Sequence, residues 1–172
     1  FIEPDAVLVL WPGRRHGQFV MFCRERDPKR ELWHGNRAGP EGACAMFGAD
    51  DAFPIGDIDE ILPGLIEGRN RVYYSMGRSA DFDRQIMGWV NTLRSKETRG
   101  AAPPGEFTDL DHMLHDQRLI KSAAELRLLR KAGTVTAAAH RRAMSRCRPG
   151  MYEYALEAEL HHEFLTAGAR HP

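Results

Sequence analysis

The chain has 172 residues, 42% of them hydrophobic and 28% charged, and its 24 basic side chains balance 24 acidic ones. This composition is typical of one globular domain, or of one domain and part of another. Net neutrality excludes a global basic field that would attract nucleic acid, and every apolar run is far shorter than the about 20 residues of a membrane span. We therefore expect a globular protein with no nucleic-acid or membrane partner.

The start of the chain and its cysteines bear on cellular location. The sequence begins at Phe1 in strand-like residues, without a basic region before an apolar stretch, so we expect no signal peptide and interpret its beginning as missing. Cys23, Cys44 and Cys147 fit neither a zinc site nor a CxxC pair, and Cys23 lies in an apolar run typical of a buried free thiol. These features favour the reducing cytoplasm over secretion.

Two apolar segments open the chain. Residues 6–11 are continuously apolar, which predicts a strand buried on both faces. A polar turn at 12–17 leads to a second apolar segment at 18–23, so we expect the two strands to form a hairpin.

The next stretch mixes irregular, helical and strand-like patterns. Residues 33–56 are rich in glycine and alanine, and we expect them to be irregular. Apolar residues at helical spacing predict a helix at 57–67, short or broken because of Pro63, and a better helix at 79–95. Residues 71–76 are typical of a third strand.

The pattern changes after residues 96–105, whose glycines and prolines make them the best linker candidate. Ser122 and Glu125 have the spacing of a capping box, which starts a helix. The expected helices are 108–117, 122–147 and 152–167. Two long helices rarely make a stable domain without a further layer.

The sequence therefore predicts a mixed α/β domain at 1–111 and a helical segment at 112–172. Each long helix of that segment has an apolar stripe that needs a partner surface. We expect the segment to begin a domain whose sheet lies beyond Pro172.

Histidines gather in the helical segment. His161, His162 and Glu163 are adjacent, but no second histidine follows at the spacing that a zincin motif requires. Adjacent helical residues point about 100° apart, so the two histidines cannot chelate one ion together. We expect a structural role for them, with Glu157 and His161 forming a surface pair.

Other charged clusters are interpreted as ordinary surface. His112 and His115, which lie beside Asp111 and Asp116, are expected to be caps or exposed rather than metal ligands. Arginine pairs at 14–15 and 141–142 are expected to be solvated charge. No phosphate loop, GxSxG motif or Cys/His nucleophile pair is found, so the sequence contains no complete active site.

Trp33 is the strongest binding candidate that the residues themselves offer. It lies beside His34 and Gly35 in a glycine-rich stretch, where an aromatic side chain can face a ligand. A buried loop anchor is the other interpretation, and composition alone favours it.

Several segments resemble the aminopeptidase P (Xaa-Pro aminopeptidase) family, in order and over nearly the whole chain. Two segments are similar to the N-terminal domain of the family: EPDAVLVL at 3–10 and ELWHGNR at 31–37. Five are similar to its catalytic domain: RLIKS at 118–122, LRKAG at 129–133, RPGMYEY at 148–154, ELHHEF at 159–164 and GAR at 168–170. RPGM is shared with prolidases, whereas its combination with ELWHGNR and HHEF is specific to the aminopeptidase P type.

The resemblance implies a creatinase-like N-terminal domain, with a mixed sheet and flanking helices, followed by the opening helices of a pita-bread α+β catalytic domain. It implies hydrolysis of the bond between an N-terminal residue and a following proline, with two metal ions per subunit, usually Mn²⁺. The family binds these ions through two aspartates, a histidine and two glutamates, and matching places all five beyond Pro172. We therefore expect this chain to contain no catalytic or metal-binding residue and to be inactive alone.

The resemblance also implies partners. In family members that form tetramers, the N-terminal domain of one subunit reaches toward a neighbour's active site, so we expect a homo-oligomer, dimer or tetramer. Trp33, in the matching segment ELWHGNR, is the residue that we expect to make this contact, and Arg99 is expected to assist, although the sequence around it matches poorly. The expected substrates are proline-containing peptides.

Two alternatives stay open at this point. One is a prolidase-type Xaa-Pro dipeptidase, and the other is a non-catalytic creatinase-like module used for peptide binding or oligomerisation. An Asp-rich strand pair after Pro172, followed by histidine and glutamate ligands, would favour an enzyme.

Overall fold

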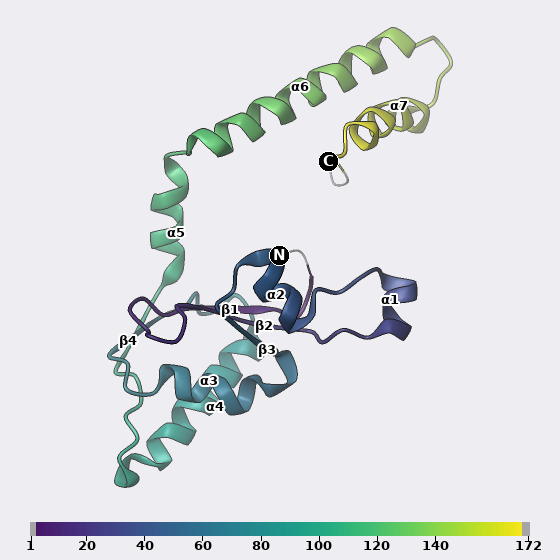
Figure 1. The fold of residues 1–172 in the computed structure, drawn as a ribbon. Helices are drawn as coiled ribbons and strands as arrows, with labels where there is room; N and C mark the ends of the chain where they lie inside the picture. Colours follow the sequence, from purple (N-terminus) through teal and green to yellow (C-terminus); the bar gives the residue numbers. More distant parts are fainter. Residues whose placement is uncertain (1–2, 170–172) are drawn as a thin grey trace. The chain divides into compact units, whose positions relative to one another are not determined.

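The computed structural model describes residues 3–169, and the chain divides into two compact units, Phe1–Leu110 and Asp111–Pro172 (Figure 1). The elements of the first are β1 (Val7–Leu10), β2 (Phe19–Cys23), α1 (Pro28–His34), α2 (Gly39–Phe47), β3 (Asp51–Pro54), the 3-10 helix η1 (Ile55–Asp57), α3 (Ile58–Ile66), β4 (Arg71–Tyr73), α4 (Ala80–Ser95), the 3-10 helix η2 (Glu97–Arg99) and β5 (Glu106–Thr108). Those of the second are α5 (Leu110–Leu119), α6 (Ala123–Arg146) and α7 (Glu153–Thr166). The expected mixed α/β class is confirmed.

Three layers form the centre of the first unit. The sheet has the order β1-β2-β3, in which β1 is antiparallel and β3 parallel to β2. Because side chains alternate along a strand, Val20 and Phe22 face one side of the sheet and Met21 and Cys23 the other. Helices α3 and α4 cover the first side and α2 covers the second (Figure 1).

The larger core lies between the sheet and helices α3 and α4. Phe22 is fully buried and packs at 5.7 Å, centroid to centroid, from Phe53. The buried residues that the two helices contribute are Ile58, Leu62, Leu65, Ile66, Ile86, Trp89, Val90 and Leu93. Trp89 also donates a hydrogen bond of 2.8 Å from Nε1 to Asp59 Oδ1, so its indole N–H is satisfied.

The apolar patterns predicted the first unit's helices well. The helix expected at 79–95 is confirmed as α4, and Ser79 caps it by accepting a hydrogen bond from Phe82 N. Helix α3 is short, as expected, but Pro63 does not break it. Its four buried apolar residues offset the one backbone hydrogen bond that Pro63 cannot make.

The expected hairpin of β1 and β2 is confirmed, but the burial of its first strand was wrong. Leu8 and Leu10 are exposed, because β1 lies at the edge of the three-stranded sheet and α2 packs on β2 and β3 instead. Val7 and Val9, on the opposite face, do pack against the larger core.

Three other expectations need correction. Residues 33–56 are not irregular, since they contain α2 and β3, and β3 pairs in parallel with β2. The strand expected at 71–76 is shorter: β4 ends at Tyr73 and pairs with β5 in a separate parallel sheet. Residues 96–105 are not a linker, since they lie inside the first unit, where Ala102 O accepts a 2.7 Å hydrogen bond from Gly68 N.

The second unit begins its longest helix as the sequence predicts. Ser122 Oγ accepts from Glu125 N at 3.3 Å, and Glu125 Oε2 accepts from Ser122 N at 2.7 Å, which completes the capping box. Helix α7 packs on α6, and their bounds confirm the expected pair of long helices. Within the described part of the chain, no helix has both the length and the apolarity to cross a membrane.

Candidate functional site

Residues 24–38, which we call the arm, leave the end of β2 and return to the start of α2. Helix α1 forms the middle of the arm and lies away from the three-stranded sheet (Figure 1). Asp27 caps this helix: its Oδ1 accepts from Lys29 N at 3.1 Å and from Arg30 N at 3.2 Å. Gly35 ends the helix at a φ of 82°, a backbone conformation that glycine adopts without strain.

Trp33 lies at the exposed end of this arm. Its side chain is 82% exposed and that of its neighbour Leu32 is 80% exposed, so Trp33 is not a buried anchor of this unit. In α1 only Glu31 is buried. Apolar packing therefore contributes little to holding the helix that carries Trp33.

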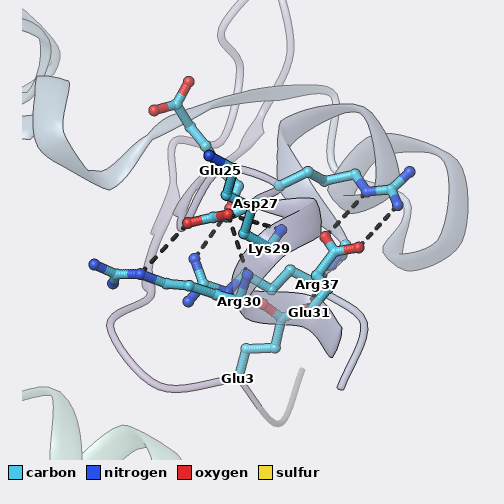
Figure 2. A network of polar contacts seen from close by, with 9 residues as sticks. Glu3, Glu25, Asp27, Lys29, Arg30, Glu31 and Arg37 are labelled. Atoms are coloured by element: carbon cyan, nitrogen blue, oxygen red, sulfur yellow. Dashed lines mark hydrogen bonds and ion pairs between the residues drawn. The ribbon is translucent and has the colours of Figure 1, made fainter. Parts of the chain in front are cut away.

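A charged network holds the arm instead (Figure 2). Arg26 forms a bidentate pair with Glu31, with distances of 3.2 Å from Nε to Oε1 and 2.9 Å from Nη2 to Oε2. The hydrogen bonds from Arg26 lower the pKa of Glu31, and backbone amides near the carboxylate act in the same direction. The side chain of Glu31 is only 7% exposed, so it lies inside the arm as an anion.

Both ends of the arm are also tied at its base. Arg37 Nη1 donates to the carbonyl oxygen of Glu25 at 3.4 Å, which links the segment that follows α1 to the segment that precedes it. Glu3 Oε1 accepts from Ala38 N at 2.7 Å and so fixes the point where α2 begins. Glu3 also pairs with Arg24, with 3.8 Å between Oε2 and Nη2.

Arg99, the second candidate for substrate binding, lies in a different place. It is the last residue of η2, directly after α4, and it is exposed. Arg99 and Trp33 therefore lie on different elements of the first unit, η2 and α1.

Arginines 14 and 142 are not the solvated charges that the sequence suggested. Arg14 Nη1 lies 3.0 Å from Asp51 Oδ2, and its guanidinium lies over the ring of Trp11. Arg142 joins α6 to α7, with 2.6 Å from its Nε to Glu159 Oε2. Both side chains are partly buried and have long-range partners that sequence spacing does not reveal.

The histidine pairs of the second unit have ordinary partners. His161 Nε2 lies 3.8 Å from Glu157 Oε1, as expected for neighbours one helical turn apart. His112 Nε2 lies 3.7 Å from Asp116 Oδ2 in the same arrangement. All four side chains are mostly exposed.

Comparison with known proteins identifies both units. Residues 1–73 match the family described as "Aminopeptidase P, N-terminal domain", and residues 127–172 match "Metallopeptidase family M24". The chain carries an aminopeptidase P N-terminal domain followed by part of an M24 metallopeptidase domain.

Named relatives agree with this identification over the whole chain. The chain is 41% identical to Xaa-Pro aminopeptidase of Escherichia coli, over 100% of its length and 39% of the relative. Against Xaa-Pro aminopeptidase of Haemophilus influenzae the identity is 34%, over 100% of the chain and 37% of the relative. The solved structure of Pseudomonas aeruginosa aminopeptidase PepP superposes with a TM-score of 0.96 at 63% identity, covering 100% of the chain and 39% of that structure. The chain thus spans about two fifths of the length of these relatives.

The described part of the M24 segment does not fit a site for two metal ions. Two close cations need several convergent carboxylates, but three of the four acids of α7 have other partners. Glu157 pairs with His161, and Glu159 and Glu163 both pair with Arg142. Among residues 3–169, no three potential ligands from His, Cys, Asp and Glu come together.

The sequence pointed to Trp33 but not to helix α1, which carries it, or to the contact between Arg26 and Glu31, which holds that helix. Asp27-Pro28 is a usable signal, because aspartate favours the N-cap and proline the first helical position, and Gly35 is a typical stop. These three residues could have predicted α1. The bidentate contact between Arg26 and Glu31 could not be predicted in this way, since Arg26 lies outside the helix.

Proposed function

We propose that the full-length protein is a Xaa-Pro aminopeptidase, which hydrolyses the bond between an N-terminal residue and a following proline. The observation that carries this proposal is the match to the E. coli enzyme of that name, which covers the whole chain, from the N-terminal domain into the M24 segment. A prolidase-type dipeptidase has no comparable support from the named relatives.

Within that enzyme, this chain supplies the N-terminal domain and not the metal site. Two Mn²⁺ ions per subunit are bound by a part of the enzyme outside this chain. This agrees with α7, where Glu159 and Glu157 already form ion pairs with Arg142 and His161. The chain on its own is inactive and binds no metal tightly. Isothermal titration of residues 1–172 with Mn²⁺ should show no tight site, and two tight sites would contradict this assignment.

Trp33 is the substrate-binding residue of this domain. In a homo-oligomer, dimer or tetramer, the arm of one subunit reaches the active site of its neighbour and offers the indole to the peptide. Support comes from the exposure of Trp33 at the end of a helix whose own contacts are polar. Arg99 assists from a separate element of the same domain.

The enzyme acts in the cytoplasm. Cys23 is buried, Cys44 half-buried and Cys147 exposed, and all three are free thiols. Burial raises the pKa of the Cys23 thiol, which disfavours the reactive thiolate. Unpaired cysteines of this kind suit a reducing compartment.

The test compares Trp33→Ala with wild type in the full-length enzyme. An aromatic wall remote from the reacting atoms provides uniform binding, so KM should rise about three- to tenfold for peptides longer than two residues, with little change in kcat. Steady-state kinetics on a tripeptide and on a longer Xaa-Pro peptide measure both constants. Leu32→Ala is the matched control, because Leu32 is equally exposed on the same helix.

Three outcomes would count against these assignments. An unchanged KM together with loss of the oligomer would make Trp33 a structural anchor rather than a binding residue. Equal hydrolysis of a peptide with alanine in place of proline would contradict the proposed specificity. Cleavage of dipeptides alone would favour the prolidase alternative.

A further inference from the structure

Helix α1 has too few internal contacts to be stable by itself. It has seven residues, whereas isolated helices shorter than about 12 to 15 residues are marginal in water. Six of its residues are exposed, among them Leu32 and Trp33. The orientation of Trp33 must therefore come from the polar contacts of the arm.

We infer that the pair of Arg26 and Glu31 positions Trp33 for substrate binding. Glu31 and Trp33 are two residues apart on α1, which separates them by about 200° around the helix axis. Glu31 therefore holds one face of the helix to Arg26, while Trp33 lies on the opposite face. This inference rests on the proposed role of Trp33 in binding the peptide.

Glu31 is the centre of the arm's contacts. Its carboxylate accepts both hydrogen bonds from Arg26, its carbonyl oxygen accepts from Gly35 N at 3.0 Å, and its amide donates to Asp27 O at 2.8 Å. These contacts join the residue before the helix, the N-cap and the residue that ends the helix. The two backbone bonds are those of an ordinary helical turn, so the side-chain contact that ties α1 to the segment before it is the bidentate pair of Arg26 and Glu31.

The path of Arg26 to this carboxylate is built into the backbone. Gly39 has a φ of 67°, and a Cβ placed on it would lie 2.8 Å from Arg26 Cγ. The aliphatic part of Arg26 therefore passes directly over Gly39, where no other residue leaves room. A guanidinium contacts both carboxylate oxygens at once and fixes an angle, which a lysine ammonium cannot do.

The experiment uses the full-length enzyme and the variant Arg26→Met, with Arg26→Lys as the conservative replacement. Arg30→Met is the matched control, since Arg30 lies on α1, close to Arg26 in sequence, and its exposed side chain pairs with Asp27 at 3.4 Å rather than with Glu31. KM and kcat for an Xaa-Pro tripeptide are measured in each, alone and combined with Trp33→Ala. Hydrogen–deuterium exchange over residues 28–35 reports the order of the arm independently of activity.

The expected result is specific to a positioning role. Arg26→Met should raise KM about as much as Trp33→Ala, which is three- to tenfold, while leaving kcat within about twofold. Arg26→Lys should lie between wild type and Arg26→Met, and Arg30→Met should match wild type. In the Trp33→Ala background, Arg26→Met should add nothing, because its effect passes through Trp33. Exchange over 28–35 should be fastest in Arg26→Met, intermediate in Arg26→Lys and unchanged in Arg30→Met.

Several results would overturn the inference. If Trp33→Ala raises KM and Arg26→Met does not, the proposed function stands and the positioning role is lost. The positioning role is also lost if the two substitutions add, because Arg26 would then act independently of Trp33. If Trp33→Ala itself leaves KM unchanged, the binding role of Trp33 fails and this inference fails with it, whatever the exchange rates show.

Discussion

Phe22 in the first unit is fully buried between two helices and a neighbouring strand, whereas Leu128 on α6 in the second unit is 68% exposed. The contrast holds for each unit as a whole. The first has two cores, one on each face of its sheet. In the described part of α5, α6 and α7, only Ala139 is buried.

The apolar surface of the second unit is arranged for a partner. Leu128, Ala132, Val135 and Phe164 line a groove of about 330 Å³ between α6 and α7. Leu156 and Leu160 are only half-buried by the packing of the two helices. Since most helical stability in proteins comes from tertiary packing, we expect these helices to depend on the rest of the M24 domain, whereas the first unit carries its own core.

The largest expected difference is between two leucines truncated in the same way. Leu62→Ala should lower the free energy of unfolding by about 2 to 5 kcal/mol, because it removes buried methyl groups and leaves a cavity. Leu128→Ala should change it by no more than about 0.5 kcal/mol, since its side chain is exposed. Urea denaturation of residues 1–172 compares the two directly. Equal losses would contradict the contrast between the units.

A smaller, pH-dependent effect is expected within the second unit. The hydrogen bond from Arg142 lowers the pKa of Glu159 below its ordinary value of 4.5. A carboxylate with a depressed folded-state pKa contributes stability above its unfolded pKa, and this contribution is lost as the pH falls through the folded pKa. The packing of α6 on α7 should therefore weaken as the pH falls below about 4.5.

Arg142→Met removes this dependence. The variant should be less stable than wild type at pH 7 and lose less stability on acidification, because Glu159 has no partner left to lose. Thermal unfolding followed by circular dichroism between pH 7 and pH 3 measures both effects, with exposed Arg141→Met as the control. Parallel pH profiles for wild type and Arg142→Met would show that the pair does not couple the helices.

Local patterns were enough to predict the helices. The stripe of α4 and the capping box of α6 depend on residues within one or two turns, and both were found at nearly their true bounds. The edge position of β1 was missed because exposure of Leu8 and Leu10 depends on where α2 packs. Strand β3 was missed because it is four residues long and pairs with β2 across a gap of about thirty residues, which no local pattern records.

The candidate site also has one part that the sequence could predict and one part that depends on the fold. Trp33 was singled out by its place in a glycine-rich stretch and then by the resemblance, and its exposure became known only from the fold. The contact of Arg26 with Glu31 requires the chain to bend before α1, and the approach of Arg26 to Gly39 requires α2 to begin where it does. Such contacts depend on three-dimensional placement and have no periodic signature in sequence.

Hydrogen–deuterium exchange is the most direct measurement of the difference between the two units. It would compare residues 1–172 alone with the full-length enzyme, under identical conditions. The amides of β2 and α4 should be equally protected in both, because their core lies within the first unit. The amides of α6 should be protected in the full-length enzyme and exchange much faster in the shorter chain. Full protection of α6 in a monomer of residues 1–172 would contradict the dependence of the second unit on the rest of the M24 domain.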